Sequence, residues 1–156
     1  MALFLFAFFY LAGCSEKEEL SENAKIAKNF LTNRGYEVIE HEKDGSHNFS
    51  KSDMKSIFVR QVWAVQDKGP DEYGNQRIDT VSFFIKNHPL DNEYDMGRTY
   101  ATVWLIDGKV FGGWSYPISK NNDISGAPYS LNGKTADEIK TDYQKWVEDW
   151  QDKYGR

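Results

Sequence analysis

The segment TYATVWLIDGKVFGGWSY, from Thr99 to Tyr116, decides the fold expected for this chain of 156 residues. Residues 99–106 and 109–116 are rich in β-branched and aromatic side chains, which are enriched in strands. Asp107-Gly108 between them is typical of the two-residue turns that join antiparallel strands. Gly112 and Gly113 indicate a bulge or the close approach of another backbone. The segment therefore predicts a β-hairpin and, with it, an antiparallel sheet.

Upstream of this hairpin, further segments have the composition of strands. Residues 57–66 (IFVRQVWAVQ) and 77–86 (RIDTVSFFIK) are predicted to pair, and the Gly- and Pro-containing stretch 67–76 is predicted to be the loop of their hairpin. Residues 36–39 are predicted to form a short strand that ends at the turn-like stretch 43–45. The sheet is therefore expected to have about four to five strands in hairpins.

A helix is predicted at the start of the domain. Ser21 is a candidate N-cap, because a serine side chain accepts hydrogen bonds from the free N–H groups of the first turn. Gly35 stands where a left-handed residue commonly ends a helix. Between them, one helical face is formed by the apolar residues Ala24, Ala27, Phe30 and Leu31.

A second, amphipathic helix is predicted at the C-terminal end of the chain. Thr135, followed three residues later by Glu138, has the spacing of a capping box, and Gly155 can end the helix. Its apolar stripe consists of Ile139, Tyr143, Trp146, Val147, Trp150 and Tyr154. Helices segregated from an antiparallel sheet predict a single α+β domain, over residues 24–156.

The N-terminal residues 1–13 (MALFLFAFFYLAG) contain no charged side chain. A helix that spans a bilayer needs about 20 apolar residues, whereas the apolar core of a secretory signal has about 7 to 15. Residues 1–13 are therefore predicted to be a signal peptide. The charged stretch that follows is predicted to be a flexible tether, over residues 14–23.

Leu11, Ala12, Gly13 and Cys14 end this segment with a leucine, two small residues and the single cysteine of the chain. The pattern resembles the lipobox of bacterial prolipoproteins, and the rest of the chain resembles small bacterial lipoproteins. The resemblance implies that the Cys14 thiol receives diacylglycerol, with fatty acids such as palmitate, and that a signal peptidase cleaves before Cys14. Two acyl chains anchor a protein stably, so the domain is expected on the extracytoplasmic face of the cell membrane.

The composition excludes several classes of function. Nineteen Lys and Arg against 24 Asp and Glu give a net charge of -5, so no nucleic-acid partner is expected. A single cysteine excludes a disulfide framework and a cysteine-rich zinc site. The motifs of nucleotide-binding loops, serine hydrolases and zinc proteases do not occur. No catalytic residue, metal ligand or cofactor is therefore predicted, apart from the lipid on Cys14.

Histidines and an acidic segment leave alternatives open. His41 and His47 could bind zinc together with neighbouring carboxylates, although exposed loop histidines are commoner. The segment 88–95 (HPLDNEYD) superficially resembles a calcium loop, but Met96 and Thr102 stand where the glycine and the glutamate of such a loop are required. An envelope hydrolase that uses carboxylates or His88 is the alternative to a binding function.

The hairpin also supplies the candidate binding surface. Strand alternation predicts that its Tyr and Trp rings share one face, and its glycines would let a ligand approach the backbone. The rings are core if the terminal helix packs on that face, and a platform for a sugar, a peptide or a partner chain if part of the face stays exposed. The candidate residues are Tyr100, Trp104, Gly112, Gly113, Trp114 and Tyr116. The leading hypothesis is a membrane-anchored lipoprotein whose small domain binds an envelope protein, a peptide or a glycan.

Overall fold

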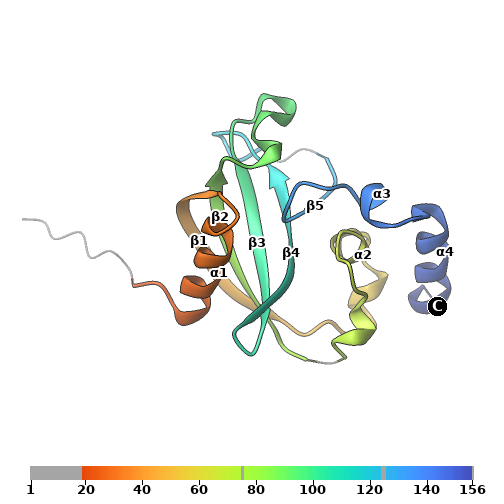
Figure 1. Ribbon diagram of the computed structural model, residues 1–156. Helices are drawn as coiled ribbons and strands as arrows, with labels where there is room; N and C mark the ends of the chain where they lie inside the picture. The colour runs from red at the N-terminus through yellow and green to blue at the C-terminus, as the bar shows by residue number, and fades with distance from the viewer. Residues whose placement is uncertain (1–18, 75, 124–125, 156) are drawn as a thin grey trace, which may run out of the picture.

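The computed structural model describes residues 19–74, 76–123 and 126–155. Its centre is a five-stranded antiparallel sheet of strand order β1-β2-β3-β4-β5, in which each strand lies beside the next one along the chain (Figure 1). The strands are β1 (Glu37–His47), β2 (Ile78–Lys86), β3 (Thr99–Ile106), β4 (Lys109–Pro117) and β5 (Tyr129–Ser130).

The α-helices are α1 (Glu22–Thr32), α2 (Ile57–Ala64), α3 (Ala136–Ile139) and α4 (Tyr143–Tyr154). Three short 3-10 helices complete the fold: η1 (Asp53–Lys55), η2 (Pro70–Glu72) and η3 (Pro89–Asp95). The predicted α+β class is confirmed, with a helix before the sheet and a helix after it.

The β3–β4 hairpin forms as predicted. Asp107 and Gly108 both have positive φ, 48° and 70°, as a type I′ turn requires. Trp104 pairs with Gly112 and Leu105 pairs with Val110, so β4 carries one extra residue at this point. This is the predicted bulge, and a bulge bends a strand and increases its twist.

The prediction that residues 57–66 form a strand is wrong, because residues 57–64 form α2. Its buried residues Val59, Val62 and Trp63 are three and four positions apart, which is the period of a helix face. The β-branched and aromatic composition suggested a strand, but the buried positions have the spacing of a helix. Residues 67–76 are therefore not a hairpin loop; they carry η2 and connect α2 to β2.

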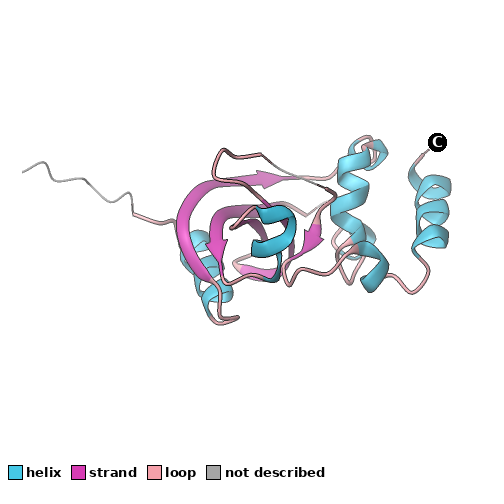
Figure 2. Cartoon of the chain, turned by 90° about the horizontal axis from the view of Figure 1, so that it is seen from above, coloured by secondary structure: helices cyan, strands magenta, loops and turns pink. Residues whose placement is uncertain are grey.

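The predicted short strand at residues 36–39 is in fact β1, which has 11 residues and includes the supposed turn at 43–45. β1 pairs with β2 along its length, and its register shifts twice, between Val38 and Glu40 and between His41 and Lys43. Charged residues are common on edge strands, where they discourage further pairing. They also hide the alternation by which a strand is recognised. Seen from above, the sheet is strongly curved (Figure 2).

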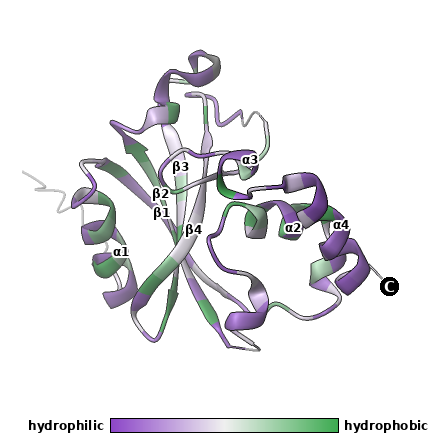
Figure 3. Ribbon diagram, turned by 45° about the vertical axis from the view of Figure 1, so that its right-hand side comes forward, coloured by the Kyte–Doolittle hydropathy of each residue, from purple (hydrophilic) through white to green (hydrophobic). Residues whose placement is uncertain are grey.

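Two hydrophobic clusters lie on opposite faces of this sheet. On one face, Ala24, Ala27 and Leu31 of α1 pack with residues of β2 and β3 that include Phe83 and Val103. On the other face, residues of α2 pack with Ile78, Trp104, Met54 and Trp150. The order of layers is therefore α1, sheet, α2, with α4 outside α2 (Figures 1 and 3).

The predicted C-terminal helix is interrupted. The capping box of Thr135 and Glu138 is present and opens α3, which ends at Ile139. The Asp142 side chain then accepts a hydrogen bond from the Lys145 N–H at 2.9 Å and opens α4 as a new N-cap. The Trp150 indole of α4 donates to the Met54 carbonyl at 2.9 Å. α4 therefore packs beside α2 and η1 instead of on the hairpin.

The folded domain begins slightly before the predicted boundary at residue 24. The Ser21 hydroxyl accepts a hydrogen bond from the Ala24 N–H at 3.0 Å, as predicted for an N-cap, and Leu20 packs against the α1 side of the core. The predicted signal peptide and Cys14 lie outside the described residues. Within the residues that are described, no helix combines the length and the apolarity that crossing a membrane requires.

Candidate functional site

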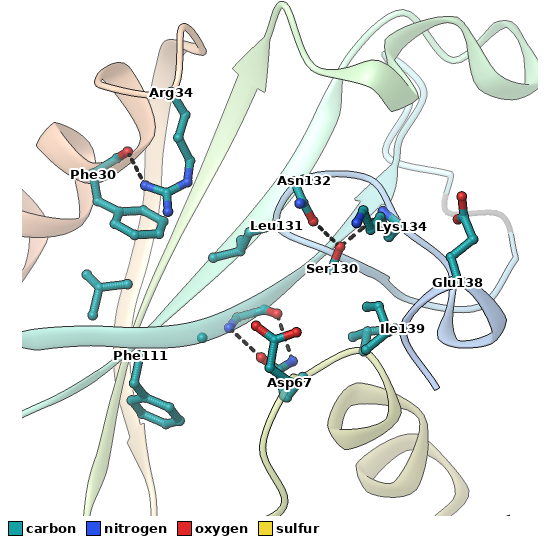
Figure 4. A pocket seen from close by; sticks show the side chains of 15 residues that line it. Phe30, Arg34, Asp67, Phe111, Ser130, Leu131, Asn132, Lys134, Glu138 and Ile139 are labelled. Atoms are coloured by element: carbon teal, nitrogen blue, oxygen red, sulfur yellow. Dashed lines mark hydrogen bonds between the residues drawn. The ribbon is translucent and has the colours of Figure 1, made fainter. Parts of the chain in front are cut away.

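An open depression lies along the edge of β4 that faces β5 and α3 (Figure 4). We call it the edge pocket; its volume is about 530 Å³. α1, the end of α2, β4, the segment after β5 and α3 all contribute to its lining. The lining residues are Phe30, Arg34, Val65, Gln66, Asp67, Val110, Phe111, Gly112, Gly113, Ser130, Leu131, Asn132, Lys134, Glu138 and Ile139.

The edge pocket exists because β5 is short. β5 pairs only with Trp114 and Ser115 of β4. In the described part of the chain, β4 from Lys109 to Gly113 therefore has a strand on one side only, namely β3. A strand edge without a partner presents main-chain N–H and C=O groups to whatever lies beside it.

Gln66 occupies one end of this open edge. Its side-chain Nε2 donates to the Gly113 carbonyl at 2.8 Å, and its Oε1 accepts from the Gly113 N–H at 3.0 Å. Nε2 also donates to the Val62 carbonyl of α2 at 2.7 Å. Only 7% of Gln66 is exposed. The carboxamide therefore pairs with Gly113 as one residue of a neighbouring antiparallel strand would.

Both glycines of the hairpin are required at this contact. A Cβ at Gly112 would collide with the Gln66 carboxamide oxygen. A Cβ at Gly113 would collide with the Thr102 carbonyl and would lie 2.8 Å from the Leu131 side chain. The glycines were predicted to mark a bulge or the close approach of another backbone; the bulge is present, and the group that approaches the main chain of β4 here is the Gln66 side chain.

Charged groups of both signs surround the edge pocket. The Arg34 guanidinium lies 3.5 Å from the centre of the Phe30 ring and donates to the Phe30 carbonyl at 3.3 Å. Lys134 is a second cation, and Asp67 and Glu138 are the anions. Hydrogen bonds from the Thr135 N–H and hydroxyl hold the pKa of the Glu138 carboxyl below its usual value.

Further hydrogen bonds at and beside the edge pocket involve Ser130, Asn132 and Lys140. The Ser130 hydroxyl donates to the Asn132 side-chain oxygen at 2.5 Å and accepts from the Lys134 N–H at 3.0 Å. The Lys140 ammonium donates to the Gln66 main-chain carbonyl and ties α3 to the end of α2. Burial lowers the pKa of Lys140, although Asp67 opposes that shift.

The six residues of the predicted binding surface lie in two places, the edge of β4 and one face of the sheet. Gly112 and Gly113 line the edge pocket. The four aromatic residues lie on the face that α2 covers, where Trp104 is 2% and Tyr116 is 7% exposed. Tyr100 and Trp114 are half-buried, with ring centres 5.8 Å apart.

One alternative from the sequence required the terminal helix to cover these rings. In the structure, α2 covers them. Trp63 of α2 packs on Trp104 instead, at 5.0 Å between ring centres. Burial raises the pKa of the Tyr116 hydroxyl to about 12. Trp104 and Tyr116 therefore belong to the packed interior, Tyr100 and Trp114 stay partly exposed, and of the six predicted residues only the two glycines line the edge pocket.

Sequence reasoning missed the other residues that form the edge pocket. Gln66 was placed inside a predicted strand, and its partner Gly113 is 47 positions away along the chain. Arg34, Asn132 and Lys134 follow secondary-structure elements and carry no local motif. The paired glycines were the one signal that marked this side of the hairpin.

His88 has a structural role in the described fold. Its Nδ1 accepts from the Leu90 N–H at 3.2 Å, so its Nε2 carries the proton and donates to the Leu131 carbonyl at 3.1 Å. The Asp91 carboxylate accepts from the His88 N–H at 3.1 Å and from the Thr99 hydroxyl at 2.9 Å. Both groups cap η3, and neither lines the edge pocket.

His41 and His47, which the sequence left open as zinc ligands, have separate partners. His41 contacts Asp44 at 2.8 Å, whereas the His47 ring nitrogen lies 3.7 Å from an Asp53 oxygen. Among the described residues, no group of three or more His, Cys, Asp or Glu side chains is arranged to hold a metal ion.

We expect stability to depend on His88 below neutral pH. Burial lowers the pKa of His88, which is 3% exposed, below its ordinary value near 6.5. The unfolded chain therefore binds a proton that the folded chain resists, and stability falls as the pH falls below about 6.5. The variant His88→Gln should unfold at lower urea concentration at pH 7.5 and lose less further stability between pH 7.5 and 5. Equal losses in the two proteins would contradict this role.

We expect Gln66→Met to destabilise the domain by about 1–3 kcal/mol, because the buried Gly113 groups lose their partners while side-chain volume is kept. Gln66→Glu should be no better, since a carboxylate accepts from the Gly113 N–H but does not donate to the two carbonyls. Urea denaturation measures both effects. Gln61→Ala, in the preceding helix α2, is the control and should change stability by about 0.5 kcal/mol or less. A wild-type midpoint in both Gln66 variants would refute the importance of the contact.

The edge pocket thus joins an unpaired strand edge to amide, hydroxyl and oppositely charged side chains, which suits the binding of a polar ligand with several hydrogen-bonding groups. Compared with known proteins, the chain matches no family model, and no curated protein or solved structure is significantly similar to it.

Proposed function

We propose that this protein is a bacterial lipoprotein, anchored through Cys14 to the extracytoplasmic face of the cell membrane, and that its domain binds a ligand in the edge pocket. The observation that carries the binding function is the open edge of β4 beside a pocket of about 530 Å³. The observation that carries the anchor is the sequence Leu11-Ala12-Gly13-Cys14 after an uncharged apolar segment.

The tether to the domain is short on this reading. Ser21, the N-cap of α1, follows Cys14 by seven residues. Even a fully extended chain of that length spans only about 25 Å. The start of α1 would therefore stay close to the membrane surface, and a ligand of the domain would be an envelope component or a molecule that reaches the envelope.

Binding is a better account of the edge pocket than His88-based hydrolysis. The His88 ring is engaged through both nitrogens with the main chain, and Asp91 caps the same 3-10 helix. The edge pocket itself offers main-chain edges, amides and balanced charges, which are groups that hold and orient a ligand. No histidine lines it among the described residues.

The anchor predicts incorporation of fatty acid at a single residue. Cells that produce the native chain in the presence of an alkyne analogue of palmitate should yield a labelled protein in the membrane fraction, with an intact mass that begins at Cys14. Cys14→Ser should be unlabelled, and Ser15→Ala should be labelled as the native chain is. A native protein without label that keeps residues 1–13 would overturn the anchor.

The binding function predicts a ligand contact at the edge pocket in the cell. A photoreactive phenylalanine analogue at Asn132 should form an adduct on irradiation of intact cells, since this position lines the edge pocket. The same analogue at Glu148, exposed on α4, should not form that adduct. Adducts of equal yield at both positions, or none at Asn132, would contradict a ligand site here.

A further inference from the structure

The main chain of β4 is the most unusual surface in the described part of the domain. β3 pairs with it on one side, while β5 accompanies it only at Trp114 and Ser115. Proteins usually cover such an edge, because it attracts further strands. Here the space beside residues 110–113 is left as the edge pocket.

Gln66 shows which chemistry this edge accepts. A side-chain carboxamide and a main-chain peptide group carry the same donor and the same acceptor. The carboxamide makes both hydrogen bonds to Gly113, at 2.8 and 3.0 Å. Gln66 thus takes the place of one residue of an added antiparallel strand, whose N–H and C=O would make the same two bonds, and the pocket continues from there along β4.

The pocket has the shape that an added strand requires. Neighbouring strands lie about 4.8 Å apart, and the edge pocket leaves open space beside residues 110–113 of β4. Phe30 and Leu131 lie on one side of the β4 ribbon, and Phe111 projects from the other (Figure 4). Alternate side chains of an added strand point to opposite faces, so each set finds an apolar contact.

The charges around the pocket favour a polypeptide over a uniformly charged polymer. Arg34 and Lys134 are balanced by Asp67 and Glu138. A polyanion would meet the two carboxylates, whereas a peptide can offer side chains of both signs.

We propose that the ligand of the edge pocket is an extended peptide segment of a partner protein, which pairs with β4 as an added strand beyond Gln66. This inference rests on the proposed binding function of the edge pocket. Main-chain hydrogen bonds would supply much of the affinity, and the apolar and charged groups on the two sides of β4 would supply the sequence preference.

The test uses the native lipoprotein, extracted from membranes in detergent. Random dodecapeptides displayed on phage are selected for binding to it. One selected peptide is then synthesised in two versions, with main-chain N-methyl groups on the odd-numbered residues in one and on the even-numbered residues in the other. Methylation of the set that pairs with β4 should weaken binding by about tenfold per blocked hydrogen bond. Methylation of the other set should change the affinity little. Binding should also protect from exchange those amide hydrogens of residues 110–112 that face the edge pocket.

Pocket variants complete the test. Lys134→Glu should alter the affinity of the peptide, and Lys28→Glu, on an exposed position of α1 outside the edge pocket, should leave it unchanged. Equal effects of the two methylation patterns, or no protection of the pocket-facing amides of residues 110–112, would overturn strand pairing.

A second probe separates this inference from the function on which it rests. The probe is a β-1,4-linked oligomer of N-acetylglucosamine. Suppose that this oligomer binds, that Lys134→Glu weakens its binding, and that no peptide is selected. The edge pocket is then a ligand site, but the peptide proposal is wrong. If neither probe binds and the photoreactive group at Asn132 gives no adduct, both proposals fail.

Discussion

The paired hydrogen bonds between Gln66 and Gly113 connect the end of α2 to the open edge of β4. Gln66 also bonds to Val62 in α2, so a single buried carboxamide joins the helix to the strand edge. With the end of α2 held at β4, Trp63 lies against Trp104 and the second face of the sheet is closed. The same contact forms one end of the edge pocket, because the carboxamide occupies the edge at Gly113 and the open part of β4 continues from there.

Local signals were sufficient for the hairpin, for α1 and for the α+β class. Asp107-Gly108 determines a turn by its own backbone preferences, and Ser21 caps a helix by a contact three residues away. Longer-range packing decided the rest. Residues 57–64 form a helix because Val59, Val62 and Trp63 must face the sheet together, and β1 was underestimated because its residues are mostly charged and exposed.

The candidate site shows the same division. Alternation correctly placed Tyr100, Trp104, Trp114 and Tyr116 on one face of the hairpin, since the register pairs Tyr100 with Tyr116 and Thr102 with Trp114. Which helix covers that face depends on contacts between distant segments, and α2 took the place expected for the terminal helix. The edge pocket likewise collects residues from α1, α2, β4 and α3, so no stretch of sequence contains its pattern.

The proposed anchor and the edge pocket share one structural element. The N-terminal end of α1 adjoins the predicted tether, whereas Phe30 in its last turn and Arg34 just beyond it line the pocket. Its 11 residues span about 17 Å. A lipid on Cys14 would therefore hold the pocket within about 40 Å of the membrane, when a fully extended tether is added to the helix. A partner held in the same membrane would meet the pocket at high effective concentration, so weak strand pairing would be enough to keep the two together.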